Sequence, residues 1–195
     1  MEVEMKIRGL MMDPVTNMPI VILKDVSGDA VLPIWVGIYE ANAIALEIEK
    51  VTTPRPMTHD LIKNLLVGLD TQVHKVVVSD LREDTFFAVI WLEREGRVIS
   101  VDSRPSDALA LALRLDCPIF VEDTVLKSSK LASSVSDKVS SEELRKWLEN
   151  PPAFRPNTYM PRFWGLTNNK DTLDRNAIDS GDVGLAVGDV SGHGL

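Results

Sequence analysis

Apolar and charged residues alternate at the start of the chain. Residues 2–8 read EVEMKIR, in which each apolar side chain lies between two charged ones. This two-residue period is typical of a strand with one buried face. Two short apolar runs follow, over 19–26 and 31–36, on either side of a Ser-Gly-Asp turn that is typical of a hairpin. The pattern therefore predicts strands for the first part of the chain.

Two segments then carry the apolar spacing of helices. Residues 38–50 (IYEANAIALEIEK) repeat small and apolar side chains at the spacing of one helical face. A second helix is predicted over 59–69, with Thr58 as the residue that caps its first turn. The predicted buried face of this second helix consists of Leu61, Leu65 and Leu66.

Strands and helices continue in mixed order along the chain. Strands are predicted over 73–79, 85–92 and 97–101, followed by a helix over 105–115 and a last short strand over 118–121. Because the strands and helices do not alternate strictly, the order favours an α+β fold over a doubly wound one. We predict a single compact domain in which a mixed β-sheet packs with about three to four helices.

The last third of the chain has a different character. Residues 128–141 are rich in serine and lysine without a clear period, which predicts a loop or linker, and a short amphipathic helix is expected over 142–149. Prolines then become dense enough to exclude a helix. We therefore predict a domain over 1–149 and an irregular, poorly ordered, proline-rich tail over 150–195.

Composition is that of an ordinary globular protein. The 195 residues are 45% hydrophobic and 26% charged, enough to build a core. The single cysteine, Cys117, excludes an internal disulfide and suits a reducing compartment. The N-terminal residues lack the apolar core of a secretion signal, and no segment approaches the roughly 20 apolar residues of a membrane span. We expect a cytoplasmic protein that does not engage a membrane.

Polar residues gather where a predicted strand meets a predicted helix. The strand ends near Asp102, Arg104 follows it, and Pro105 opens a helix with Asp107 in its first turn. Two acids and an arginine at such a junction are a common arrangement in binding sites. A capped helix with an arginine–aspartate pair across the turn would explain the same residues, so both interpretations stay open.

Three segments carry a resemblance to a known family. They are residues 32–45 (LPIWVGIYEANAIA), 55–61 (RPMTHDL) and 101–114 (VDSRPSDALALALR), and each of them overlaps a predicted helix. In this order they resemble the bifunctional nuclease family, which is described as cutting both DNA and RNA, and the similarity runs over about residues 1–149. The resemblance implies a nuclease that hydrolyses phosphodiester bonds of DNA and RNA, with a metal assisting.

Nuclease chemistry needs carboxylates that hold a metal and a group that moves a proton. Carboxylate oxygens are the ligands that Mg²⁺ prefers, so Glu40, Asp102 and Asp107 are predicted to bind Mg²⁺. His59 is predicted to handle the proton, and Asp102 and Asp107 complete the predicted catalytic set. First-turn residues that complement the helix dipole are the alternative interpretation of Glu40 and His59.

The net charge of −8 is unusual for a protein that binds nucleic acid. A local group of cations could still face the phosphates. Arg55 and Arg104 are predicted to bind phosphate, and Lys63 and Arg114 would join them only if the fold brings them together. The alternative function is a non-catalytic module that binds phosphate or nucleic acid, or that regulates through protein interaction. A homodimer would lengthen the nucleic-acid footprint.

The chain ends in a glycine-rich segment with a second resemblance. Residues 181–195 contain GDVSGHG, which resembles the metal-binding segment of protein phosphatases of the 2C type. That resemblance implies a metal-binding role for Asp189. A lone aspartate cannot build a two-metal site, and the other carboxylates of that fold are absent. We therefore expect no phosphatase activity from this segment.

Overall fold

The computed structural model describes residues 1–13 and 16–135. The predictions for residues 142–149 and for the tail over 150–195, including its phosphatase-like end, lie outside the described residues. Within them, no helix has both the length and the apolar character that crossing a membrane requires.

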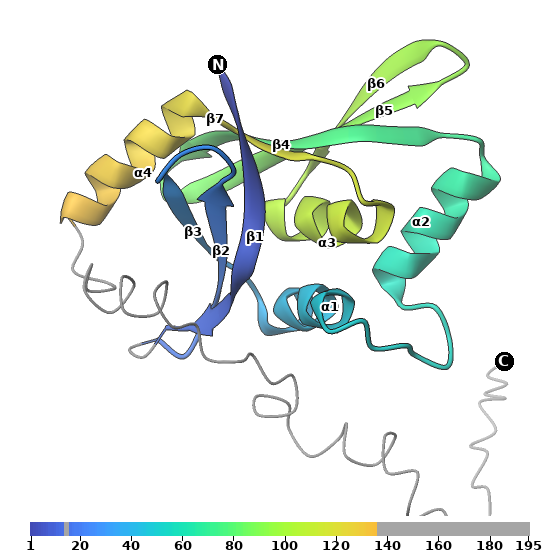
Figure 1. The fold of residues 1–195 in the computed structure, drawn as a ribbon, viewed down its shortest axis with the longest axis horizontal. Coiled ribbons are helices and arrows are strands. Elements are labelled where there is room, and N and C mark those ends of the chain that lie inside the picture. Colours follow the sequence, from blue (N-terminus) through green and yellow to red (C-terminus); the bar gives the residue numbers. More distant parts are fainter. Residues whose placement is uncertain (14–15, 136–195) are drawn as a thin grey trace, which may run out of the picture. The chain divides into compact units, whose positions relative to one another are not determined.

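Seven strands and four helices make up the described part of the chain (Figure 1). In chain order they are β1 (Glu2–Met12), β2 (Pro19–Asp25), β3 (Val31–Trp35), α1 (Ile38–Ile48), α2 (Thr58–Gly68), β4 (Gln72–Arg82), β5 (Thr85–Arg94), β6 (Arg97–Ser103), α3 (Pro105–Leu115), β7 (Ile119–Glu122) and α4 (Asp123–Val135).

All seven strands belong to one sheet in the order β3-β2-β1-β7-β4-β5-β6. Neighbouring strands are antiparallel except for β4 and β7, which are parallel. The predicted α+β fold with a mixed sheet is therefore confirmed. β7 joins the two halves of the sheet, because it pairs with β1 on one side and with β4 on the other.

The helix α3 is central to the packing. It lies against β4 and β5, and α1 and α2 both pack against it (Figure 1). Its alanine-rich sequence allows this close approach on several sides, and Leu109 is fully buried in the core beside Val76, Ala88 and Ile44. Helices α1 and α2 are therefore both positioned by their contacts with α3.

The predicted start and buried face of α2 are wrong in part. Met57, rather than Thr58, precedes the first helical turn, and the Asp60 carboxylate accepts a hydrogen bond from the Met57 N–H at 2.8 Å. Of the predicted apolar face, Leu66 contacts the core, whereas Leu61 and Leu65 are exposed. The reason is that α2 meets α3 through polar residues of its first turn, a contact that apolar periodicity does not report.

The predicted loop from residue 128 is also wrong up to Val135, because α4 continues to that residue. Val125 and Leu126 are buried against the core, and the Ser129 hydroxyl donates a hydrogen bond to the Leu126 carbonyl. Burial of its first turns therefore outweighs the low helix propensity of the serines that follow.

Candidate functional site

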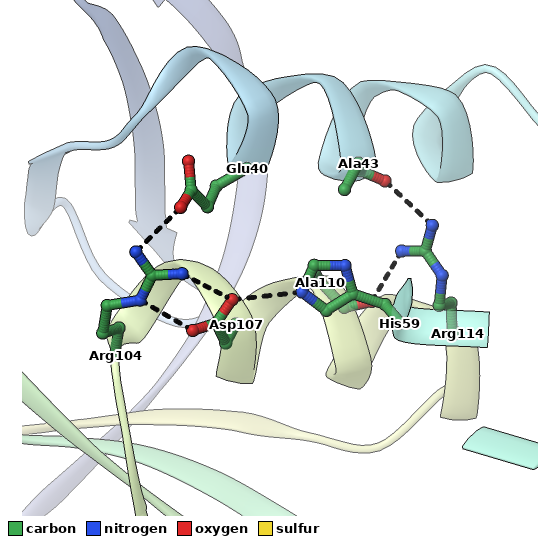
Figure 2. A network of polar contacts seen from close by, with 7 residues as sticks. All are labelled: Glu40, Ala43, His59, Arg104, Asp107, Ala110 and Arg114. Carbon is green, nitrogen blue, oxygen red and sulfur yellow. Dashed lines mark hydrogen bonds and ion pairs between the residues drawn. The ribbon is translucent and has the colours of Figure 1, made fainter. Parts of the chain in front are cut away.

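Strand β6 ends directly before α3, and Arg104 lies between the two elements. Arg104 is the last residue before the helix, and Pro105 takes the first helical position, as its fixed φ and missing N–H favour. Asp107 lies in the first turn, and Arg114 lies seven residues further on, two turns along the same face. This face of α3 looks toward α1 and α2 (Figure 2).

Arg104 joins two carboxylates from different helices (Figure 2). Its Nε and Nη2 donate to Asp107 Oδ2 and Oδ1 at 2.8 and 3.2 Å, and its Nη1 lies 2.8 Å from Glu40 Oε1 on α1. The Arg104 side chain is 65% exposed and Asp107 is 32% exposed, whereas Glu40 is mostly covered. Arg104 therefore holds the two acids together while keeping its outer edge in solvent.

His59 approaches the same aspartate from α2. Its Nε2 lies 3.1 Å from Asp107 Oδ1, and only 10% of its side chain is exposed. Burying a polar N–H group without a hydrogen-bond partner costs free energy, and Asp107 is the partner of Nε2 here. We call Glu40, His59, Arg104 and Asp107 the junction cluster.

A second ion pair, between Arg114 and Asp60, has a more deeply buried arginine. Arg114 is 3% exposed and donates from Nε to Asp60 Oδ1 at 2.6 Å, from Nη1 to the Ala110 carbonyl at 2.9 Å, and from Nη2 to the Ala43 carbonyl at 3.1 Å. One guanidinium thus connects α1, α2 and α3. His59 therefore contacts Asp107, and the adjacent Asp60 contacts Arg114. Asp107 and Arg114 are two turns apart on α3.

These contacts set the charges of the two aspartates. Partial burial by itself raises the pKa of Asp107, but the hydrogen bonds from Arg104 and His59 outweigh it and hold the pKa below its usual range. The pKa of Asp60 is lowered in the same way, because Arg114 and the Met57 N–H together outweigh burial. The pKa of Arg104 is raised, first by Asp107 and then by Glu40. Both aspartates are therefore anionic at neutral pH.

The structure brings together four of the six predicted site residues, those of the junction cluster. Asp102 lies elsewhere: it pairs with Val89 across the sheet, whereas its neighbours on either side pair with Ala88 and Ile90, which belong to the core around α3. Side chains alternate along a strand, so Asp102 lies on the face opposite α3. Arg55 is exposed in the loop before α2, and its side chain makes no ion pair with any described residue.

The predicted magnesium ligands do not form a ready metal site. Among the described residues, no group of three or more histidine, cysteine, aspartate or glutamate side chains is arranged to hold a metal ion. Glu40 and Asp107 do converge, but the Arg104 guanidinium lies between them and compensates their charge. A metal held by these two carboxylates would have to displace Arg104, so we derive no step that passes through a metal.

The ion pair between Asp60 and Arg114 was not predicted from the sequence. Arg114 was expected to face phosphates only if the fold brought it together with the other cations, and the fold instead buries its guanidinium against Asp60 and the Ala110 and Ala43 carbonyls. The spacing of Asp107 and Arg114 could have indicated that both residues pair with a neighbouring helix. Residues seven apart on one helix share a face, and an aspartate and an arginine on a face rich in alanine predict complementary partners on the packing helix.

Comparison with known proteins identifies the family of the chain. A family model described as the bifunctional nuclease domain matches residues 21–134 of the chain. The chain belongs to this family. An uncharacterised protein of Mycobacterium tuberculosis strain H37Rv is 40% identical over 144 residues, which cover 73% of this chain and 86% of that protein. The predicted resemblance over the first part of the chain is therefore confirmed.

More distant relatives of this bifunctional nuclease domain are named as nucleases. Bifunctional nuclease 1 of Oryza sativa subsp. japonica is 25% identical over 122 residues, covering 61% of this chain and 37% of the rice protein. Bifunctional nuclease 1 of Arabidopsis thaliana is 28% identical over 127 residues, covering 63% and 39%. The similarity thus spans less than half the length of either plant protein.

Proposed function

We propose that this bifunctional nuclease domain hydrolyses phosphodiester bonds of DNA and RNA at the junction cluster. One observation carries the proposal: the three sequence segments that resemble the family meet in space at this cluster. Glu40 comes from residues 32–45, His59 from residues 55–61, and Arg104 with Asp107 from residues 101–114. Family resemblance selects the three segments, and their meeting in space supports this cluster as the site.

Arg104 is the residue to which we assign phosphate binding. A guanidinium carries five N–H donors, and Arg104 uses three of them on Asp107 and Glu40. Because the Arg104 side chain is 65% exposed, we assign the remaining two donors to phosphate oxygens. The two carboxylates fix the guanidinium plane before substrate arrives, which reduces the entropy lost on binding a phosphate oxygen.

His59 is the residue to which we assign proton transfer. Since Asp107 is anionic, it accepts a hydrogen bond from the His59 Nε2–H, which leaves Nδ1 as the basic nitrogen of the neutral ring. Nδ1 makes no hydrogen bond with any described residue. A carboxylate that orients an imidazole is a recurring arrangement for general acid–base catalysis.

Cleavage of supercoiled plasmid and of labelled RNA tests the function. We expect the purified chain to cut both, and Arg104→Gln to lower the cleavage rate by about 100-fold, since a removed phosphate contact in the transition state costs roughly this much. Arg8→Gln is the matched control, because Arg8 is an exposed arginine of β1 outside the cluster. Parallel reactions with Mg²⁺ and with EDTA measure metal dependence directly.

A non-catalytic phosphate-binding module is the second candidate. The observation that favours it is that both carboxylates of the junction cluster are already ion-paired with Arg104. In that case the chain would bind labelled nucleic acid without cutting it, and Arg104→Gln would weaken binding. Absence of cleavage together with such a loss of binding would replace the nuclease proposal.

Gly37 makes room for the Glu40 carboxylate. A Cβ atom at Gly37 would come within 3.1 Å of Glu40 Cδ and closer still to Glu40 Oε2. We expect Gly37→Ala to push this flexible carboxylate away from Arg104, lowering cleavage severalfold while changing the free energy of unfolding by less than about 1 kcal/mol. Gly68→Ala is the control, since a Cβ there meets nothing within 4 Å. Equal cleavage by both variants would contradict the role of Glu40.

A further inference from the structure

Tyr39 is an exposed aromatic residue beside the junction cluster. It lies in the first turn of α1, directly before Glu40, and it is 82% exposed. Its hydroxyl makes no hydrogen bond, and its ring no cation–π contact, with any described residue. A ring that is so exposed contributes little to the core, so its face is available to a ligand.

The other aromatic side chains of the described residues already have partners. They pack against the core, donate to a buried carboxylate, or lie under a lysine or arginine side chain, and they are Phe86, Trp35, and the group of Phe87, Trp91 and Phe120, respectively. Within the part of the chain that the structure describes, Tyr39 is therefore the aromatic residue best placed to stack on a ligand.

Arg55 is an exposed cation in the loop before α2. Pro56 disfavours a helical backbone at Arg55, and the Thr53 hydroxyl donates to the Arg55 carbonyl at 2.7 Å. The Arg55 guanidinium makes no ion pair with a described residue, whereas that of Arg104 is paired with two carboxylates. Arg55 therefore offers all its donors from a restrained backbone.

Tyr39 and Arg55 lie on the two sides of the junction cluster. Asp107 lies between Arg104 and His59 (Figure 2). Tyr39 directly precedes the α1 residue that pairs with Arg104, and side chains of a first helical turn lean toward that end of the helix. Arg55 comes four residues before His59 in the chain. A strand bound across the cluster would therefore pass both residues.

We propose that Tyr39 stacks on an unpaired base of a nucleic-acid strand bound at the junction cluster, and that Arg55 pairs with a phosphate of the same strand on the other side of Asp107. This inference rests on the proposed function for the identity of the strand. Proteins that hold such a strand combine aromatic rings for the bases with cations along the backbone. Stacking accepts any base, which suits the proposed cleavage of both DNA and RNA.

The acidic character of the chain gives the stacking contact additional weight. A net charge of −8 opposes the approach of a polyanion, and few cations near the cluster are free to compensate it. Stacking on a base does not depend on a charge of the protein. Tyr39 would therefore add affinity that the net charge does not oppose.

Two fluorescently labelled oligonucleotides of equal length separate the two contacts. One is oligothymidylate, and the other carries abasic sugar–phosphate units, so that its phosphates remain while its bases are absent. Binding of each to the full chain is measured by fluorescence anisotropy at low temperature, with Mg²⁺ and with EDTA, over a series of salt concentrations. Stacking is then seen as a difference between the oligonucleotides, and phosphate pairing as a dependence on salt.

Tyr39→Ala should weaken binding of oligothymidylate by at least about fivefold and leave binding of the abasic strand unchanged. Its salt dependence should equal that of the unmodified chain, because no phosphate contact is lost. Tyr39→Phe keeps the ring and should bind normally, since the hydroxyl has no partner. Leu65→Ala removes an exposed apolar side chain of α2 and is the matched control. An equal effect of Tyr39→Ala on both oligonucleotides, or no effect, would overturn the stacking.

Arg55→Gln should show the opposite behaviour. We expect it to weaken binding of both oligonucleotides equally and to reduce the slope of log affinity against log salt by about 0.7, the value for one phosphate contact on a single strand. Arg8→Gln, the exposed arginine of β1, should leave the slope unchanged. A slope that stays the same in Arg55→Gln would overturn the phosphate pairing.

These binding measurements do not depend on cleavage. If Tyr39→Ala and Arg55→Gln behave as expected but the unmodified chain cuts neither DNA nor RNA, the proposed function fails and the two contacts stand. If the chain cuts both while neither variant shows its effect, the contacts fail and the proposed function stands. No binding of oligothymidylate up to about 100 μM, the weak end of non-specific nucleic-acid affinity, would overturn this inference.

Discussion

Asp60→Asn is expected to lower the free energy of unfolding by about 2 to 3 kcal/mol, because it leaves a buried guanidinium without its counter-ion. Arg114 is 3% exposed, and its Nε donates to Asp60 Oδ1 at 2.6 Å. An asparagine has the same shape but carries no charge. It also has one acceptor oxygen where Asp60 uses two, on Arg114 and on the Met57 N–H.

Urea unfolding followed by circular dichroism measures this change, with Asp29→Asn as the matched control. Asp29 is an exposed turn residue, and its carboxylate has no ion pair within the described residues. We expect the control to change the free energy of unfolding by less than about 0.5 kcal/mol. A loss equally small in Asp60→Asn would mean that the Asp60–Arg114 pair contributes little, as exposed ion pairs do.

The stability difference between the unmodified chain and Asp60→Asn should also depend on pH. The folded state lowers the pKa of Asp60, so this carboxylate stabilises the fold above its unfolded pKa of about 3.9 and loses that effect as the pH falls further. The difference in stability between the unmodified chain and Asp60→Asn should therefore be largest near pH 6 to 7 and shrink below about pH 4. A difference that grows on acidification would contradict the assignment.

The sequence predicts those elements whose local pattern agrees with their burial. Alternation at the start of β1 and the proline-opened start of α3 both correspond to the structure. The face of α2 does not, because Leu61 and Leu65 repeat at helical spacing while the helix packs through His59 and Asp60. A hydrophobic period shows where apolar side chains gather, but it does not show which face the neighbouring helix covers.

The contacts of the candidate site also differ in whether local sequence predicts them. Arg104 and Asp107 are three residues apart, so their pairing could be expected from the sequence. Glu40 and His59 join them only through the packing of three helices, and the family resemblance supplied that information. Asp102 was grouped with them because it is close in sequence. Strand alternation, once β6 is seen to continue to Ser103, places it on the other face.

Asp107→Asn is expected to lower the rate of DNA and RNA cleavage by at least about 100-fold, the largest effect on activity among these variants. Asp107 touches both functional partners, with Arg104 at 2.8 and 3.2 Å and His59 at 3.1 Å. The neutral amide offers one acceptor oxygen to the three N–H donors of these two residues, and it offers no negative charge to either residue. We therefore expect Arg104 to lose its fixed plane and His59 to lose its orientation together.

A structural role alone would give a different result. Asp107 is a third exposed, so Asp107→Asn should cost less than about 1 kcal/mol of unfolding free energy, and a folded but inactive variant separates catalysis from stability. The pH profile of residual cleavage should also shift, because the charge beside His59 is gone. Asp102→Asn, the same change on the opposite face of the sheet, decides the position of the site. If Asp102→Asn abolished cleavage while Asp107→Asn retained it, the active site would lie away from the three helices.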